Sequence, residues 1–492
     1  MALPSELMGH SMVAPLARDL GSNAKIIQDE ADLINANSKG QNAILYRPIT
    51  LRANLAFTGE LAFLKGGSII TNGFTLTVSG PLAAGAYQIF NTSLGGSVVF
   101  SNGKVCTEML AEWWGATGDG TTDDTTAWQA AINAARINPA INAGNIPIRA
   151  LVERTYLINS LYLPAFTIIK GPQVRKSSAV FKCNTTSATM FVVDGGDRYS
   201  DFICLEGLRF DPNGKATTCL SIESAGNMLI SDCHFHNDTS LTAVTNHILL
   251  GADAIWCWIQ RCTIDGKYTY GVHLTGGNCN QNTIRDCHFS GSTCTHAIYS
   301  DSSWAGDTLI IDNCAMETGG TTDMINLDRA SSGGLPVSQG CIATIVRCRF
   351  DRACVNSHIK IQRYTWGVKI YDCRMVDPVA YNIDSDAYYT FVADCHLGNA
   401  TSYPVRLRIN SARCHVRFNE WNPYSGGQVL DEGGDHTNTI ERKTIVDTTA
   451  NRPANMQQCE QGHLYMDNTL AADGQPIWWN GVAWVDSNGT VV

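Results

Sequence analysis

The sequence is poor in charge and lacks any long apolar run, and each absence excludes a class of protein. Lys, Arg, Asp and Glu make up 16% of the 492 residues, while glycine is abundant at 44 residues. This composition favours β-structure over helical bundles. No segment approaches the roughly 18 consecutive apolar residues of a transmembrane helix, so we expect no membrane insertion. The net charge of −10 is spread along the chain, which argues against nucleic acid as a partner.

Signals for metal binding and for export are also missing. The 18 cysteines include no C-x-x-C pair, so we expect no metal and no cofactor. The N-terminus has Glu6 at an early position and no charged segment followed by an apolar one. We therefore expect synthesis in a cytoplasm, where thiols stay reduced, and no export by the usual secretory route.

A short motif recurs through the second half of the chain. It consists of an aliphatic residue, two polar residues, a cysteine, a polar residue and an apolar one, as in NTIRDCHFSG at 282–291. Leu208 takes the cysteine's place in the first copy, and the later copies place cysteine at Cys233, Cys262, Cys287, Cys314, Cys348, Cys373, Cys395 and Cys414. The mean step is about 26 residues, which is typical of a stacked supersecondary repeat.

The apolar positions around each cysteine indicate how the repeat folds. Three residues before the cysteine stands an aliphatic residue in every copy except the last, which has Ser411. Two residues after it an apolar residue always follows, ending with Val416. A straight strand would alternate with period two, so this spacing indicates a bend just before the cysteine, where Asp, Asn, Arg or Gly stands. The sequence therefore predicts an all-β, right-handed parallel β-helix whose thiols line the core.

The same alternation places cysteine and histidine on opposite faces. In the D-C-H copies the cysteine points inward and the histidine outward, so the two cannot share a metal ion. His234, His288, His396 and His415 then form a discontinuous outward row. We expect these histidines to be solvated or hydrogen-bonded, with general-base work a minor alternative.

Composition divides the chain into four expected regions. Residues 1–45 are polar and form an N-terminal attachment segment, and residues 46–111 form a small β module of short strands and Gly-rich turns. Residues 112–440 hold the β-helix. Residues 441–492 form a C-terminal trimerisation or tip module with a hairpin around Asn480-Gly481.

A helix is expected at the start of the β-helix region. Asp123 or Asp124 can cap it. One stripe of this helix carries the apolar residues Ala127, Trp128, Ala131, Ile132 and Ala135.

The segment EWWGATGDGTTDD at 112–124 resembles the start of the solenoid in the pectate-lyase-like β-helix superfamily, where the short helix caps the open end. The whole layout, ending in PIWWNGVAWV, is similar to bacteriophage tailspike proteins. This resemblance implies a homotrimer in the virion tail, made in the host cytoplasm and bound to other tail or adaptor proteins through its N-terminus. It also implies binding and cutting of bacterial surface polysaccharide at the host cell surface. We expect Asp119, Asp123 and Asp124 to form turns and a cap, and assign them no catalytic role.

Hydrolysis of a glycosidic bond requires two carboxyl groups, and aligned coils offer a way to find them. With the inward residues of the third strand of each coil fixed, a first outward ladder contains Ser221, Leu249, His273, Tyr299, Asn326, Lys360, Asp384 and Arg406. A second contains Glu223, Gly251, Thr275, Asp301, Asp328, Gln362, Asp386 and Arg408. Asp328 lies one coil from Asp301, roughly 5 Å, and two coils from Asp386, roughly 10 Å.

We predict Asp328 as one catalytic carboxyl group, with Asp301 or Asp386 as the other. The closer pair suits a retaining mechanism and the wider pair an inverting one. The side chains expected to bind sugar by stacking or by charge are Tyr299, Trp304, Arg329, Arg363, Tyr364 and Trp366.

Two other functions remain open from the sequence. A polysaccharide lyase would act by β-elimination on a polymer containing uronic acid, with Tyr299 and Lys360 transferring the proton, and would leave a product that absorbs ultraviolet light. A non-catalytic adhesin would bind the polysaccharide and leave its chain length unchanged.

Overall fold

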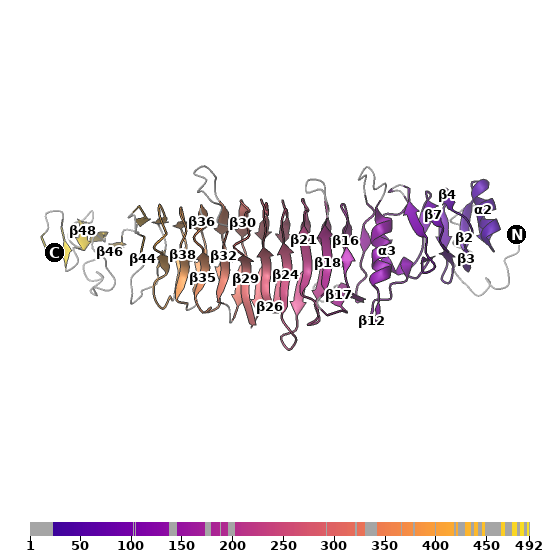
Figure 1. Cartoon of the computed structure of the whole chain (residues 1–492). Helices are drawn as coiled ribbons and strands as arrows, with labels where there is room; N and C mark the ends of the chain where they lie inside the picture. The colour runs from indigo at the N-terminus through magenta and orange to yellow at the C-terminus, as the bar shows by residue number, and fades with distance from the viewer. Residues whose placement is uncertain are drawn as a thin grey trace. The chain divides into compact units, whose positions relative to one another are not determined.

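The structure is a computed structural model dominated by parallel strands that stack coil upon coil (Figure 1). It describes residues 23–101, 103, 105–136, 145–172, 179–186, 188–194, 202–291, 293–319, 322–329, 342–365, 367–376, 379–398, 400–417, 420–421, 429–433, 437–440, 445–447, 464–467, 475–479, 483–486 and 490–491. The chain divides into two compact units, the first Met1–Thr185 with Asp201–Arg209 and the second Thr186–Ser200 with Phe210–Val492. No helix in the described part of the chain is long and apolar enough to cross a membrane.

The N-terminal part of the first unit is itself built from short parallel strands. Besides α2 (Glu30–Ser38) it contains β1 (Ala24–Ile27), β2 (Asn42–Leu45), β3 (Pro48–Thr50), β4 (Leu55–Phe57), β5 (Leu61–Phe63), β6 (Ser68–Ile70), β7 (Thr75–Val78), β8 (Leu82–Ala83), β9 (Phe90–Asn91) and β10 (Ser97–Phe100). The strands form three sheets, in the orders β1-β2-β5-β8, β3-β6-β9 and β4-β7-β10. The described pairings in all three are parallel, so the short strands expected here stack as coils, beginning upstream of residue 46.

The rest of the first unit contains the expected helix. Around α3 (Thr125–Ala135) lie β11 (Met109–Leu110), η2 (Ala111–Trp114), β12 (Asp119–Asp123), β13 (Ile148–Arg149), β14 (Thr155–Ile158), β15 (Leu161–Tyr162), β16 (Ile168–Lys170), β17 (Ala179–Cys183) and β19 (Cys204–Glu206). The predicted apolar stripe is confirmed except at Ala127, which is partly exposed, because Trp128, Ala131, Ile132 and Ala135 are buried. The Trp128 ring packs edge-on against Tyr156, with centroids 4.9 Å apart.

The two aspartates before α3 have different tasks. Asp123 Oδ1 accepts a hydrogen bond from the Thr125 backbone N–H at 2.9 Å, which is an Asx turn just before the helix. The N-cap residue is Asp124, and its side chain makes no capping hydrogen bond. Asp124 instead accepts from the backbone N–H groups of Thr117 and Gly118, at 2.7 and 3.1 Å. The acidic residues of the G-D-G-T-T-D-D stretch therefore hold the turn that leads into the helix.

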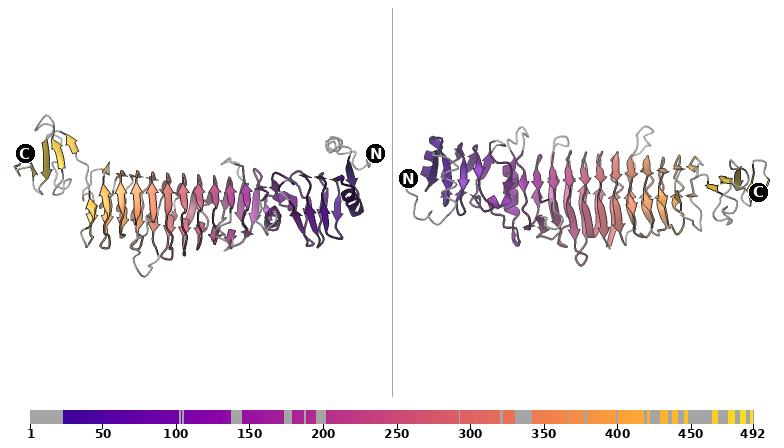
Figure 2. Two further views of the ribbon diagram at one scale, coloured as in Figure 1. Left: turned by 90° about the horizontal axis from the view of Figure 1, so that it is seen from above. Right: turned by 180° about the vertical axis from the view of Figure 1, so that it is seen from behind.

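The second unit stacks its strands in three columns (Figures 1 and 2). Column one contains β22 (Leu229–Ser231), β25 (Trp258–Gln260), β27 (Thr283–Arg285), β30 (Leu309–Asp312), β33 (Ala343–Val346), β36 (Val368–Tyr371), β39 (Phe391–Ala393), β42 (His415–Arg417) and β45 (Thr439–Ile440). Column two, after the bend, contains β23 (His234–Asn237), the first half of β26 (Thr263–Leu274), β28 (His288–Gly291), β31 (Ala315–Thr318), β34 (Arg349–Phe350), β37 (Arg374–Met375), β40 (His396–Leu397) and β43 (Glu420–Trp421).

Column three provides the surface on which the aspartates were predicted. It contains β18 (Thr189–Asp194), β21 (Thr218–Glu223), β24 (Val244–Leu250), the second half of β26, β29 (Thr293–Ser300), β32 (Asp323–Leu327), β35 (Ser357–Ile361), β38 (Tyr381–Ser385), β41 (Val405–Leu407) and β44 (Val429–Asp431). The predicted parallel β-solenoid is confirmed, since strands of successive coils pair in parallel within every column.

The predicted cysteine ladder is confirmed from Cys233 to Cys395, whose side chains are at most 2% exposed. Every described cysteine is a free thiol. Each ladder thiol lies close to the carbonyl two residues earlier, for example Cys287 Sγ at 3.2 Å from the Arg285 carbonyl oxygen. The residue between them adopts a positive φ of 52–55°, which turns the strand; these residues are Asp232, Arg261, Asp286, Asn313, Arg347, Asp372 and Asp394.

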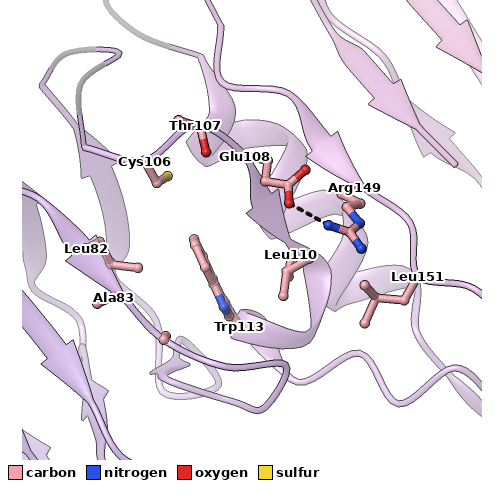
Figure 3. A pocket seen from close by; sticks show the side chains of 10 residues that line it. Leu82, Ala83, Cys106, Thr107, Glu108, Leu110, Trp113, Arg149 and Leu151 are labelled. Carbon is pink, nitrogen blue, oxygen red and sulfur yellow. Dashed lines mark hydrogen bonds and ion pairs between the residues drawn. The ribbon is translucent and has the colours of Figure 1, made fainter. Parts of the chain in front are cut away.

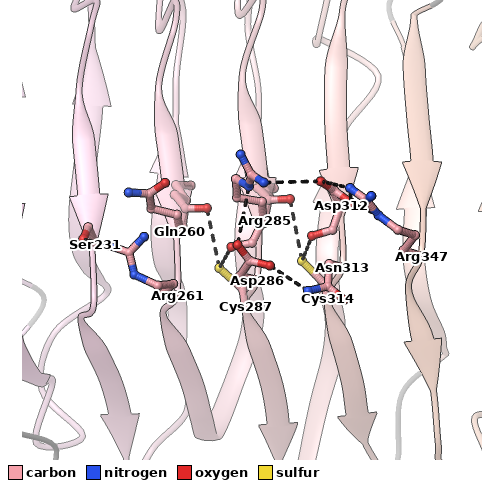
Figure 4. Close-up of polar contacts among 12 residues, drawn as sticks. Ser231, Gln260, Arg261, Arg285, Asp286, Cys287, Asp312, Asn313, Cys314 and Arg347 are labelled. Atoms are coloured by element: carbon pink, nitrogen blue, oxygen red, sulfur yellow. Dashed lines mark hydrogen bonds and ion pairs between the residues drawn. The ribbon is translucent and has the colours of Figure 1, made fainter.

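The charges at and beside this bend pair between coils (Figure 4). Arg261 donates to both oxygens of Asp232, at 2.9 and 2.7 Å, and Arg347 pairs with Asp312 at 2.6 Å. Opposite charges on neighbouring coils therefore balance each other along this part of the solenoid.

The last predicted member of the ladder is wrong. Val416 pairs with Val392 and His415 with Phe391, so the coil is displaced by five residues from the predicted register. Cys414 is buried, but it takes the place that Cys257 has in its own coil. The missing aliphatic residue at Ser411 is the sign of this error, because Ser411 does not occupy a core position of column one.

The C-terminal strands form a separate small sheet in the order β46 (Ile445–Asp447), β47 (Leu464–Asp467), β48 (Gln475–Trp479) and β49 (Trp484–Val485). The predicted hairpin is confirmed by the antiparallel pair of Trp479 with Trp484. Its turn residues Asn480 and Gly481 lie outside the described residues.

Candidate functional site

Both predicted outward ladders run along column three. The first is confirmed by strand pairing, which joins His273 to Tyr299, Tyr299 to Asn326 and Asn326 to Lys360. The second continues just beyond the strand ends. There the backbone N–H groups of Asp301 and Asp328 donate to carbonyls of the preceding coil, Leu274 and Ser300, both at 3.2 Å. Asp301 and Asp328 therefore lie on adjacent coils.

Asp301 is held by hydrogen bonds to both of its carboxylate oxygens. Oδ2 accepts from Thr275 Oγ1 at 2.7 Å and lies 3.2 Å from His273 Nε2. Oδ1 accepts from the Ser303 backbone N–H at 2.8 Å and from the Ser303 hydroxyl. Burial by itself would raise the pKa of Asp301, but these hydrogen bonds outweigh it and lower that pKa. The group is therefore ionised at neutral pH.

Asp328 has a different environment one coil away. Among the described residues its carboxylate has one hydrogen bond, from the Arg329 backbone N–H to Oδ1 at 2.8 Å. Burial raises the pKa of Asp328, and the negative charge of Asp301 raises it further, against the opposing Arg329 hydrogen bond and the positive charge of Lys360. The pKa values of two carboxyl groups on adjacent coils are thus shifted in opposite directions.

Asp386, the third predicted carboxylate, is bound to one neighbour. Its two oxygens accept from the Asn410 side-chain amide at 3.0 Å, and Oδ1 also accepts from the Asn410 backbone N–H at 3.2 Å. Beside it, buried Asp384 accepts from Arg408 Nε at 2.7 Å in a two-point pair. That pair raises the pKa of Arg408. The Arg408–Asp384 pair was not predicted, because it connects the two outward ladders diagonally.

A further ion pair continues this surface. Arg406 donates to Glu432 at 3.0 Å and lies over the Tyr381 ring, 5.2 Å from its centroid. Glu432 is the next member of the second ladder, since its backbone N–H donates to the Leu407 carbonyl at 2.7 Å. The stretch VLDEGG at 429–434 carries this signal, and extending the ladder by one coil would have found it.

Tyr299 belongs to a group of rings that sequence reasoning found only in part. Its ring stacks on Tyr270, with centroids 4.5 Å apart and planes at 10°, and it also contacts His273 and His296 at 5.2 and 5.0 Å. Tyr270 and His296 pair across neighbouring coils two residues before the inward position of their strands. One face of Tyr299 is therefore covered by Tyr270, and the group forms an aromatic wall beside Asp301.

The other predicted sugar-binding residues fall into three kinds. Trp304 is wrong as a sugar contact, because its side chain is wholly buried and its indole N–H donates to the Cys279 carbonyl at 3.2 Å. Arg363 and Tyr364 are exposed in the turn after column three, with the guanidinium 5.6 Å from the ring centroid. Arg329 is partly buried next to Asp328, and burial lowers its pKa. Trp366 lies outside the described residues.

A pocket of about 480 Å³ lies in the first unit, and no predicted site residue lines it (Figure 3). Trp113 forms its apolar wall, and Arg149 pairs with Glu108 at its rim, with Nη1 2.7 Å from Oε1. Burial raises the pKa of the Cys106 thiol to about 12, so this thiol is not a nucleophile at neutral pH. We therefore assign no catalytic role to the residues that line this pocket.

Three side chains of types that can ligate a metal ion lie close together on column two. The separation expected within D-C-H holds, since Cys233 is buried and His234 is partly exposed. His234 instead lies with His236 and Asp265, and their ligand atoms are all within 4.8 Å of one another. The H-F-H stretch at 234–236 and the aspartate at the matching position of the next coil are the sequence signal for this cluster.

Comparisons with known proteins find matches among solved structures and none among family models or curated proteins. Tailspike protein 3 of bacteriophage CBA120 matches with 15% identity and a TM-score of 0.35, over 78% of this chain and 69% of that one. ORF18 of Geobacillus virus E2 matches with 16% identity and a TM-score of 0.40, over 68% of this chain and 61% of that one.

A solved enzyme structure matches at the same level. The catalytic unit of a thermostable α-1,3-glucanase from Streptomyces thermodiastaticus shares 14% identity with a TM-score of 0.37, over 68% of each chain. Similar solved structures thus include a phage tailspike protein and an α-1,3-glucanase. At these scores the likeness carries no argument about activity, and the chain spans only about three fifths of the Geobacillus virus protein.

Proposed function

We propose that this protein is a phage tailspike that binds a bacterial surface polysaccharide along column three and cleaves it by glycoside hydrolysis. The observation that carries the proposal is the Asp301–Asp328 pair on adjacent coils, one carboxyl group with a lowered pKa and the other with a raised pKa. Environments that shift the pKa values of two carboxyl groups in opposite directions leave one group as an acid and its partner ionised. The similarity of the whole layout of the sequence to bacteriophage tailspike proteins supports the same substrate class.

In this mechanism Asp328 is the general acid. Its raised pKa keeps the carboxyl group protonated to higher pH, and it donates its proton to the glycosidic oxygen as the bond to the anomeric carbon breaks. Lys360, in the adjacent first ladder, lies near enough to lower the pKa of Asp328, and its positive charge would stabilise the carboxylate that forms when Asp328 gives up its proton. The Tyr299 group forms the wall beside which a sugar ring would lie.

The second carboxylate determines the stereochemistry. Asp301, one coil away, would exchange part of its hydrogen-bond network for the substrate and attack the anomeric carbon, forming a covalent glycosyl-enzyme. Water activated by the Asp328 carboxylate would then hydrolyse this intermediate, and the two displacements together retain the configuration. Asp386, two coils away, would activate a water molecule and invert the configuration. Proton NMR of the first product separates the two, because retention and inversion release opposite anomers.

A lyase mechanism based on Tyr299 has less support. A tyrosine that abstracts a proton needs its phenolate, but burial and the charges of Asp301 and Asp328 raise the pKa of Tyr299. These charges favour a tyrosine that keeps its proton.

The test compares the full chain with its Asp328→Asn variant on a panel of purified capsule, exopolysaccharide and O-antigen preparations. We expect the variant to lose depolymerisation by at least about 100-fold, the low end for an acid–base group, while it still binds the polysaccharide. Asp372→Asn is the matched control, since this exposed aspartate occupies a bend where asparagine is equally tolerated. Full activity in Asp328→Asn rejects the site, and unchanged chain length with the unmodified protein supports an adhesin.

We further propose that three chains assemble into a homotrimer attached to the tail through its N-terminal region. The outward face of column one carries apolar side chains that such an assembly would cover. Trp258 and Ile310, which occupy the same outward row, are 39% and 37% exposed. Side-by-side packing would also protect the flanks of the solenoid and create grooves between the chains.

A further inference from the structure

Two histidines and one aspartate form a compact cluster on column two, a different face from the proposed catalytic surface. His234 and His236 alternate with buried Phe235 on β23, so both imidazoles project outward. Asp265 stands directly opposite His236 in the register of β23 and β26. Two paired strands of the stacked coils therefore fix all three side chains.

The geometry of the cluster is that of a ligand set. His234 Nε2 lies 2.9 Å from Asp265 Oδ2, and His236 Nδ1 contacts Asp265 Oδ1. The three ligand atoms are within 4.8 Å of one another, and the side chains are between 25% and 32% exposed. Ligands at about 2 Å from a tetrahedral zinc ion lie about 3–3.5 Å apart, so small side-chain rotations would let one ion contact all three.

We propose that His234, His236 and Asp265 bind a first-row transition-metal dication, of which Zn²⁺ is the representative. Two imidazoles and one carboxylate suit this class, whereas Ca²⁺ and Mg²⁺ prefer sites made of oxygen. When the ion binds, the proton on each coordinating ring nitrogen moves to solvent or to the other nitrogen of the ring. The remaining coordination positions of the ion would be filled by water, since the three side chains are partly exposed. Because the ligands come from adjacent coils, the ion also links β23 to β26.

The neighbouring coils supply a comparison within the same fold. Two coils after His234, His288 pairs with Glu317 at 3.2 Å, but Ser290 stands where the second histidine would be. That pair has one imidazole and one carboxylate and cannot complete the set. A simple outward histidine–acid pair therefore recurs on column two, while the two-histidine cluster is confined among the described residues to β23 and β26.

Cobalt(II) titration of the chelator-treated full chain tests the proposal, with visible absorption as the readout. We expect one equivalent of Co²⁺ per chain to produce d–d bands without the intense near-ultraviolet charge transfer of thiolate ligation, and Zn²⁺ to abolish the bands by competition. His236→Gln and His234→Gln should each weaken binding by at least about tenfold. His288→Gln, the matched control, should bind as the unmodified chain does.

A second readout keeps the result independent of spectroscopy. Zn²⁺ should raise the melting temperature of the unmodified chain and of His288→Gln, and leave that of His236→Gln unchanged. Circular dichroism would establish that the variants are folded. Bands that persist in both His236→Gln and His234→Gln, thiolate charge transfer in the unmodified chain, or no cobalt binding at all would overturn the proposal.

Discussion

At the scale of single residues, the balance of charges around Asp328 gives the first prediction. Its raised pKa means that the protonated acid persists below that pKa and is lost as pH rises through it, so activity should fall on the alkaline side. The positive charge of Lys360 opposes this rise in the pKa of Asp328. Replacing Lys360 by Met should therefore move the alkaline limb of the kcat/KM profile to higher pH by a fraction of a unit, while Lys369→Met on column one should leave it in place. A limb that stays or moves to lower pH contradicts this assignment.

The thiol ladder gives the second residue-scale prediction. Cys287 is 2% exposed, and a carboxylate there would be buried without a partner. Cys287→Asp should lose more than about 3 kcal/mol of unfolding free energy or fail to fold. Cys287→Ala, which removes only a small apolar group, should lose about 1 kcal/mol. Denaturant unfolding measures both, and an Asp variant as stable as the Ala variant would show that the thiol faces solvent.

At the scale of the element, the bend between columns one and two carries a backbone requirement. Asp394 has a φ of 55° and an exposed side chain. A β-branched residue is strained in this region, so Asp394→Ile should cost about 1–2 kcal/mol relative to Asp394→Asn, which tolerates it. Equal unfolding free energies for the two variants would mean that the bend is not fixed by this residue.

The repeat pattern predicts each element only where it is unbroken. From Cys233 to Cys395 an aliphatic residue, a bend residue and a thiol recur together, so the columns follow from the sequence. At Cys414 the thiol persists without its aliphatic partner, and strand pairing of Val416 with Val392 overrides the local match. Arg413 has a positive φ of 54°, as Trp256 and Tyr389 do at a second bend of their coils. Because residues as different as Arg, Trp and Tyr occupy this bend, no one residue type predicts it from the sequence.

The backbone positions of the candidate site residues could be predicted from the sequence, but the directions of several of their side chains could not. The ladders placed Asp301 beside Asp328 because parallel pairing fixes backbone positions. They could not show that Trp304 turns inward to reach the Cys279 carbonyl, since its place is set by the fold of a turn. They also missed the Arg408–Asp384 pair, because a long side chain crosses from one ladder to the other.

At the scale of the whole molecule, the exposed apolar row of column one predicts assembly. Trp258→Glu combined with Ile310→Glu would put charges into the proposed interface between chains and should convert the trimer to monomers. Light scattering after size-exclusion chromatography measures this. Arg374→Glu, at an exposed position on column two, is the control for the change of charge. A monomeric unmodified chain, or trimers that persist in the double variant, would contradict this interface.

The most direct measurement of the central claim is made in water enriched in oxygen-18. The full chain is incubated with purified bacterial surface polysaccharides, and the shortened products are analysed by mass spectrometry and ultraviolet absorbance. Hydrolysis predicts one heavy oxygen at each new reducing end and no new absorbance, with no products from Asp328→Asn. An unlabelled, ultraviolet-absorbing product, or polysaccharide of unchanged length, would contradict the account.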